Sequence, residues 1–151
     1  MALERTFIIL KPDTVQRGLL GEVISRLERR GLKFVALKLM RIDDALARRH
    51  YAALADKPFF PGLIEFITSG PVLVGVVEGP SAAQTVRDTV GATNPLQAAP
   101  GTVRFEFGVS TGRNLIHAAQ PGEAEQEIAN FFTPQELLNY PRATDAWILE
   151  E

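Results

Sequence analysis

A run of five apolar or β-forming residues near the start of the chain, Thr6 to Leu10, stops at Lys11-Pro12. Proline has no backbone N–H to donate to a sheet, so a strand cannot continue through it. A short apolar run that is closed in this way is typical of a buried strand. The run is far too short for a membrane span or a secretion signal, and no small-residue cleavage site follows it. We therefore expect a sheet with a buried strand, and a cytoplasmic protein.

Helix and strand patterns alternate along the rest of the chain. From Leu20, apolar residues at Val23, Ile24 and Leu27 form the stripe of an amphipathic helix that ends at Gly31. Further strands are predicted at residues 32–40, 72–77 and 115–118. Further helices are predicted from Asp43 to about Ala55, after Pro58, at residues 81–90, from Ala124, and from a capping box at Thr133.

This order of elements contains two β-α-β halves. It predicts an α+β fold, the ferredoxin-like split β-α-β sandwich, in which a four-stranded antiparallel sheet has helices packed on one face. The chain has 151 residues, without an internal repeat or a linker, so we expect a single domain over residues 1–151. After Tyr140, the tail is expected to pack Trp147 and Ile148 on the surface.

The stretch from Ala92 to Arg113 holds two prolines and three glycines and shows no sustained periodicity. Connections of this length without structure are uncommon in a compact domain, and those that occur are often functional. We therefore expect a long functional loop here.

Charge and composition exclude several classes of function. Lysine and arginine total 16 against 18 aspartate and glutamate, so nucleic acid is not an expected partner. The chain has no cysteine, which excludes disulfides, thiolate zinc sites, iron–sulfur clusters and cysteine nucleophiles. Its two histidines are too few for a histidine-rich metal cage, and no residue is assigned as a metal ligand. Carboxylates could still hold a hard cation through a bound phosphate.

The glycine-rich fingerprints of nucleotide-binding loops are absent, so any phosphate must be bound by side chains. Four cationic residues are candidates because they lie at the end of a strand, in a helix or in the long loop: Lys11, Arg87, Arg104 and Arg113. Each of them alone is more often a solvated surface charge.

His117 follows the apolar segment Leu115-Ile116 and precedes a helix that carries Glu123, Glu125 and Glu127. A histidine in apolar surroundings is most often structural. The functional interpretation is a nucleophile whose imidazole is oriented by a carboxylate and approached by a phosphate bound to cations.

Two aromatic positions also allow two interpretations. Phe59 can anchor the start of a helix, or it can offer a face on which any nucleotide base stacks. His50, beside Tyr51 in a predicted helix, is interpreted as a surface or packing residue.

The chain resembles the nucleoside diphosphate kinase family in several motifs that occur in the same order, from about Arg5 to Trp147. These motifs are residues 6–13 (TFIILKPD), 15–19 (VQRGL), 50–51 (HY), 57–60 (KPFF), 69–72 (SGPV), 91–95 (GATNP), 100–104 (PGTVR) and 112–117 (GRNLIH). Independent motifs in one order make a chance match very improbable.

The resemblance implies a ping-pong kinase, in which His117 takes the γ-phosphate of a magnesium-bound nucleoside triphosphate, becomes phosphohistidine, and passes the group to a nucleoside diphosphate. It implies that Glu127 orients the histidine and that Phe59 stacks on the base. It also implies phosphate and ribose contacts from Lys11, Tyr51, Arg87, Thr93, Arg104 and Asn114. The resemblance also implies a homo-oligomer built from dimers, either a tetramer or a hexamer. The loop from Ala92 to Arg113 agrees with this expectation, because it has little apolar content with which to fold back alone.

The sequence departs from the family pattern close to the same site. The family usually has glycine at Thr14, glycine and aspartate at Phe105-Glu106, and Gly-Ser-Asp where this chain has Ala118-Ala119-Gln120. One residue is missing before the last helix, so the match of Glu127 depends on the Glu-Ile step. We expect these departures to slow the enzyme without abolishing its activity. The alternative is a nucleotide-binding module with little turnover, and a pure scaffold protein ranks last.

Overall fold

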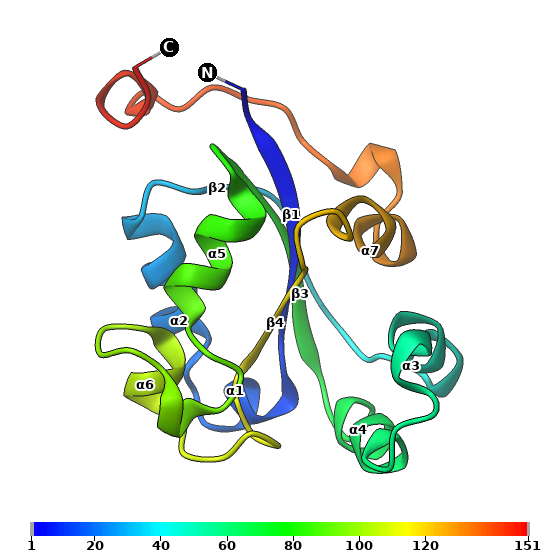
Figure 1. Ribbon diagram of the computed structural model, residues 1–151. Coiled ribbons are helices and arrows are strands. Elements are labelled where there is room, and N and C mark those ends of the chain that lie inside the picture. The colour runs from blue at the N-terminus through cyan, green and yellow to red at the C-terminus, as the bar shows by residue number, and fades with distance from the viewer. Residues whose placement is uncertain (1, 151) are drawn as a thin grey trace.

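The computed structural model describes residues 2–150 and contains a four-stranded antiparallel sheet in the order β2-β3-β1-β4 (Figure 1). The strands are β1 (Glu4–Leu10), β2 (Lys33–Met40), β3 (Val72–Gly79) and β4 (Ile116–Ala118). The connection from β1 to β2 and the connection from β3 to β4 each contain a helix, α2 (Leu20–Arg29) and α5 (Ala82–Val90). This topology confirms the predicted ferredoxin-like split β-α-β fold.

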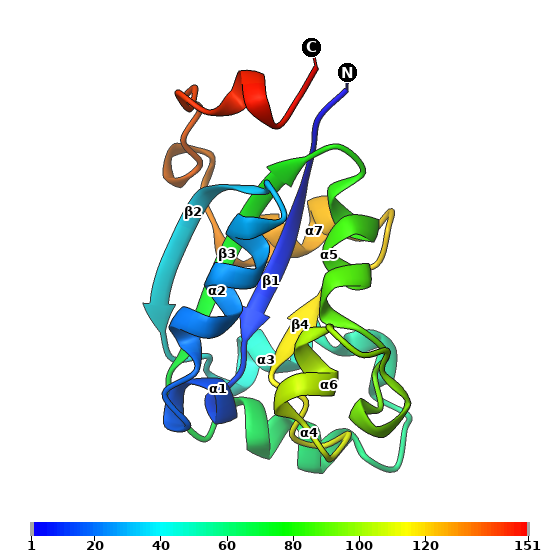
Figure 2. The same cartoon turned by 90° about the vertical axis from the view of Figure 1, so that its left-hand side faces the viewer.

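Helices cover both faces of the sheet, as the edge-on view in Figure 1 and the turned view in Figure 2 show. On one face, α2, α5 and α6 (Val103–Phe107) pack on Ile8 and Leu10 of β1. On the other face, α3 (Asp44–His50), α4 (Phe60–Ile67) and α7 (Ala124–Phe131) pack on Phe7 and Ile9. The expectation of helices on one face was therefore wrong. A strand that is buried on both sides needs apolar residues at every position, which is why β1 reads as a continuous apolar run.

Local sequence signals account for most helix ends. The Asp43 side chain accepts a hydrogen bond from Leu46 N at 2.8 Å and so caps the start of α3. This helix ends at His50, earlier than the predicted end near Ala55, and a 3₁₀ turn at Ala52–Leu54 follows it. The short helix α1 (Pro12–Gln16), which begins with proline, was not predicted. The capping box at Thr133 forms, but it begins only the 3₁₀ turn Pro134–Glu136.

Residues 92–113 are more ordered than the sequence suggested. Asn94 caps a 3₁₀ turn at Pro95–Gln97, and Thr102 caps α6, in which Val103 and Arg104 are buried. The predicted functional loop therefore contains two helical turns that were not predicted, because two short polar caps and a buried arginine fold the segment back onto α5.

The C-terminal tail differs from its prediction in one residue. Ile148 lies against Gly31, but Trp147 is 90% exposed and does not pack on this chain. Within residues 2–150, no helix reaches the length and hydropathy that a membrane span requires.

Candidate active site

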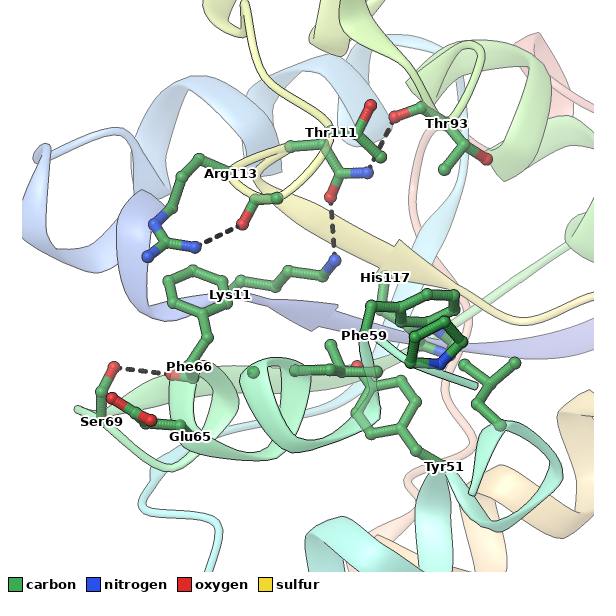
Figure 3. Close-up of a pocket in the computed structure, with 16 residues that line it drawn as sticks. Lys11, Tyr51, Phe59, Glu65, Phe66, Ser69, Thr93, Thr111, Arg113 and His117 are labelled. Carbon is green, nitrogen blue, oxygen red and sulfur yellow. Dashed lines mark hydrogen bonds between the residues drawn. The ribbon is translucent and has the colours of Figure 1, made fainter. Parts of the chain in front are cut away.

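A pocket of about 980 Å³ opens between α4, the end of β1 and the segment before β4 (Figure 3). It is lined by side chains from distant parts of the chain. Seven of the residues that the sequence singled out for function line it: Lys11, Tyr51, Phe59, Thr93, Arg113, Asn114 and His117. Strand order explains this convergence, since β1 and β4 are antiparallel neighbours, and β1 ends at the pocket where β4 begins.

His117 is the middle residue of β4 and lies opposite Ile9 of β1. Its Nε2 atom lies 2.7 Å from Oε1 of Glu127, which α7 brings to the site. A carboxylate accepts hydrogen bonds, so Nε2 carries the ring proton and donates it to Glu127. Nδ1 then keeps a free lone pair. The structure thus brings the histidine and the carboxylate together despite the residue that is missing between them.

The electrostatic environment keeps His117 neutral. Burial, followed by the nearby charges of Lys11, Arg104 and Arg87, lowers the pKa of its imidazole to about 3. Burial raises the pKa of Glu127, while Arg87 opposes that shift. A neutral imidazole among three cations is suited to receive an anionic group.

Lys11 follows β1 directly and belongs to a short polar network. Its Nζ donates to Oδ1 of Asn114 at 2.8 Å, and Nδ2 of Asn114 donates to the Thr93 carbonyl at 2.9 Å. Burial, followed by the charge of Arg104, lowers the pKa of Lys11 to about 8. The network joins the end of β1, the segment before β4 and the segment after α5.

Arg87 and Arg104 lie behind the pocket wall. The Arg87 guanidinium donates to the Ala118 carbonyl at 2.9 Å. The buried Arg104 side chain donates to the carbonyls of Asn114, Gly91 and Ile116, and burial lowers its pKa to about 10, with a further contribution from Arg87. Arg104 therefore supports the backbone that carries His117, besides adding positive charge.

A tight turn separates Asn114 from β4. Leu115 has a φ of 78°, and Ile116 N donates to the Asn114 carbonyl at 2.9 Å, so the three residues form a γ-turn. Residues with side chains seldom adopt a positive φ, and they keep it only where the surroundings hold it. Asn114 is the first residue of this turn, and His117 directly follows its last residue.

His50 is a residue that the sequence interpretation underestimated. Its ring lies edge-on to the His117 ring, with centroids 4.7 Å apart and an interplanar angle of 81°. Burial lowers its pKa to about 3, with His117 contributing next, and burial raises the pKa of the neighbouring Tyr51 hydroxyl. In the sequence, only its position next to Tyr51 pointed to a role for His50 in the site. Its contact with His117 could not be predicted, because the tertiary fold brings the end of α3 to β4.

The outer part of the pocket is aromatic. Phe59, just before α4, is 56% exposed, whereas the next residue, Phe60, is buried in the core. Arg113 lies 4.0 Å from the centre of the Phe66 ring, so its charge faces an aromatic side chain and not the His117 cluster.

Three residues of the site could in principle hold a metal ion. His50, His117 and Glu127 each offer one ligand atom, and these atoms lie within 4.8 Å of one another. Three cations surround His117, however, and their charge disfavours a bare dication. The cluster is better suited to phosphate.

Three of the residues at which the sequence departs from the family pattern, Glu106, Ala119 and Gln120, do not line the pocket. Ala119 is buried in the core and donates its N–H to the Phe7 carbonyl. The Glu106 carboxylate pairs with Arg26 and is directed away from His117. Gln120 is exposed.

Comparisons with known proteins agree with this geometry. The family model described as nucleoside diphosphate kinase matches residues 4–137. The nucleoside diphosphate kinase of Chloroflexus aurantiacus is 59% identical over 151 residues and covers 98% of this chain and 100% of its own length. That of Archaeoglobus fulgidus is 55% identical over 150 residues, with 99% of each chain covered.

Solved structures are similar over the same length. The halophilic nucleoside diphosphate kinase from Halobacterium salinarum, in complex with CDP, has a TM-score of 0.96 and 51% sequence identity, covering 98% of this chain and 99% of that one. A family protein from Babesia bovis has a TM-score of 0.93 and 43% identity, covering 97% and 99%.

Proposed function

Because this chain belongs to the nucleoside diphosphate kinase family, we propose that it transfers the γ-phosphate of a nucleoside triphosphate to a nucleoside diphosphate through a phosphohistidine at His117. The observation that carries this proposal is the 2.7 Å contact between His117 Nε2 and Glu127 Oε1 at the pocket. Lys11, Arg87 and Arg104 place positive charge around this histidine. That contact leaves Nδ1 as the nucleophilic atom.

The reaction has two mirrored halves. In the first half, the Nδ1 lone pair forms a bond to the γ-phosphorus, and the bond from phosphorus to the β–γ bridging oxygen breaks. Its electrons leave with the nucleoside diphosphate. In the second half, a terminal β-phosphate oxygen of another diphosphate attacks the phosphorus, and the electrons of the N–P bond return to Nδ1. The Nε2 proton stays toward Glu127, whose carboxylate stabilises the charged ring.

The remaining site residues bind and orient the substrates. Lys11 and Asn114, already joined by a hydrogen bond, face the pocket and contact phosphate or ribose, with Thr93 and Tyr51 beside them. Arg87 and Arg104 supply positive charge from behind His117. Phosphoryl transfer leaves little covalent work to a protein beyond such positioning and neutralisation. Phe59 offers an exposed face on which any base stacks.

Mg²⁺ enters with the nucleotide as part of the substrate. It prefers oxygen ligands and is usually held by substrate phosphates with one or two carboxylates. Among the described residues that line the pocket, Glu65 is the one carboxylate, and Glu127 is already bonded to His117. This donor set suits a cation that is held through phosphate oxygens.

A binding module with little turnover is the less favoured reading. Such a protein would have no use for a neutral histidine that is held by a carboxylate and surrounded by cations. The CDP complex of the Halobacterium salinarum relative supports a diphosphate as a substrate of this pocket. The cytoplasm, where these nucleotides are abundant, is the location that fits the activity.

A homo-oligomer, either a tetramer or a hexamer, is part of the same proposal. Its support is exposed apolar surface in two places. The edge strand β2 exposes Leu37 and Leu39, and the segment after α5 exposes Leu96, Phe105 and Val109. Edge strands and apolar patches of this kind favour contact with a second copy.

The decisive experiment is phosphate uptake from ATP and Mg²⁺, followed by intact mass spectrometry. The parent protein should gain one acid-labile, base-stable phosphate per chain. His117→Gln should gain none, whereas His50→Gln, which removes the other histidine of the chain, should still reach one phosphate per chain at the end of the reaction. Equal labelling of His117→Gln and the parent would overturn the mechanism.

A further inference from the structure

Thr14 lies in α1 and is fully buried. Its hydroxyl donates a hydrogen bond to the Leu115 carbonyl at 2.6 Å. The contact joins the first helix to the γ-turn that precedes β4.

The backbone N–H and carbonyl of Leu115 form hydrogen bonds with α1 and with Lys11, the residue before α1. The Leu115 N–H donates to Oδ2 of Asp13 at 3.1 Å. Its carbonyl accepts the Lys11 N–H at 2.9 Å as well as the Thr14 hydroxyl. A carbonyl oxygen has two lone pairs, so the Thr14 bond completes its capacity. These bonds supply the support that a residue with a φ of 78° requires.

A shift of this turn would move two residues of the site together. Asn114, on one side, binds the Lys11 ammonium group through Oδ1. His117, on the other side, must present Nδ1 in line with the phosphorus. Transfer rates depend steeply on such placement, and a misplacement of about 1 Å can lower a rate about 100-fold.

We propose that Thr14 is a positioning residue for phosphoryl transfer: its hydroxyl holds the Leu115 carbonyl and thereby fixes His117 relative to Lys11 and Asn114. Thr14 touches neither substrate nor the reacting atoms, and it acts through the γ-turn. This inference rests on the proposed function, since it concerns the geometry of that same reaction.

The test compares Thr14→Val, which keeps the shape and removes the hydroxyl, with Thr14→Ser, which keeps the hydroxyl. Thr89→Val is the matched control, because the Thr89 hydroxyl donates to a helix carbonyl, that of Thr85, at 2.8 Å and lies outside the pocket. Three quantities are measured: the single-turnover rate of His117 phosphorylation, the Kd for ADP, and the hydrogen-exchange rate of the Ile116 amide, which closes the γ-turn.

Thr14→Val is expected to slow phosphorylation about 10-fold, with the Kd for ADP changing less than about 3-fold. Its Ile116 amide should exchange faster than in the parent. Thr14→Ser should restore both the rate and the protection of this amide. Thr89→Val should transfer phosphate at the parent rate.

Two results would overturn the inference. One is parent-like phosphorylation by Thr14→Val. The other is a Thr14→Ser variant as slow as Thr14→Val, which would assign the effect to the lost methyl group. If Thr14→Val does not fold, Thr14→Ala and Thr14→Ser are compared in the same way. A parent that takes up no phosphate on His117 would refute the proposed function itself, a result distinct from a parent that reacts but does not depend on Thr14.

Discussion

Lys11 shows how one residue can carry both structure and chemistry. Its ammonium group is buried, hydrogen-bonded to Asn114, and close enough to His117 to lower the pKa of that imidazole. A buried ammonium group near another cation gives up its proton more readily than one in water. Lys11 therefore carries the positive charge that binds phosphate only below its pKa, which burial has lowered to about 8.

This lowered pKa predicts an alkaline limit of activity. Lys11 is cationic below a pKa of about 8 and loses its charge as the pH rises through that value. Since kcat/KM reports the free enzyme, it should decline above about pH 8 in the parent. Lys11→Arg keeps its charge at these pH values. Its kcat/KM should therefore stay level from pH 7 to 9, whether that value is higher or lower than in the parent.

The measurement is a pH profile of kcat/KM for both proteins with the same nucleotide pair. On the acid side, His117 should stay neutral and reactive until the pH approaches its lowered pKa of about 3. A parent profile that is level to pH 10, or a Lys11→Arg profile that falls like that of the parent, would contradict this assignment.

At the scale of elements, the junction between α5 and α6 holds the back of the site. Gly91 ends α5 with a φ of 95° and a ψ of 179°, a conformation that is nearly restricted to glycine. Its carbonyl accepts a hydrogen bond from Arg104 at 3.0 Å. A Cβ added at Gly91 would lie 2.5 Å from Oγ1 of Thr102, the residue that caps α6.

Gly91→Ala should therefore destabilise the protein by about 2 to 4 kcal/mol, because it combines backbone strain with a steric clash. Gly18→Ala is the matched control. Gly18 also has a positive φ, 68°, but a Cβ there would meet nothing within 4 Å, so its cost should be about 1 kcal/mol. Urea unfolding of both variants measures the difference. Equal costs would show that the contact with Thr102 relaxes freely.

At the start of α4, two neighbouring aromatic residues have different roles: Phe59 is exposed at the pocket and Phe60 is buried in the core. Phe59→Ala should raise KM about 10-fold for purine and pyrimidine nucleotides alike, with little change in stability, because its ring is exposed and stacks on any base. Phe60→Ala should instead lower stability by about 3 to 5 kcal/mol, since its ring is in the core. Steady-state kinetics and urea unfolding separate the two. A loss confined to one base would contradict stacking as the basis of recognition.

At the scale of the whole molecule, helices cover both faces of the sheet, whereas one edge is covered only in part. At that edge, Leu138 N donates to the Val35 carbonyl at 2.9 Å and the Tyr140 hydroxyl donates to the Phe34 carbonyl. β2 forms this edge, and Leu37 and Leu39 are 45% and 62% exposed on it. Lys33 and Lys38 of the same strand donate hydrogen bonds within the chain, to the carbonyls of Tyr140 and Phe131. Their charges are therefore not placed where they would oppose the approach of a second strand. A strand of this kind favours pairing with a second copy.

Leu39→Glu should therefore weaken the assembly, because it places a charge in the proposed contact. Sedimentation velocity at micromolar concentration should show a multiple of the 16.6 kDa chain for the parent and smaller species for the variant. Val109→Glu, in the segment after α5, tests the second exposed patch separately. A parent that sediments as a monomer would refute the proposed homo-oligomer.

The sequence by itself determined the order and type of the main elements. The apolar run of β1, the helical stripe of α2 and the breaks at glycine and proline are local patterns, and they are set by which neighbours along the chain can share one face. The family motifs added the expected roles of His117 and Glu127, which lie within 10 residues of each other in the chain.

The tertiary structure alone decided which distant residues meet. Nothing local brings His50 to His117, Thr14 to Leu115, or Arg104 to three backbone carbonyls, because those contacts depend on β1 lying between β3 and β4. The same holds for the second layer of helices and for α6, which the buried Arg104 and the Thr102 cap stabilise. Local periodicity shows which side of a helix or strand is apolar. The positions of the site residues relative to one another depend instead on the order of the strands and on how the helices pack across the sheet.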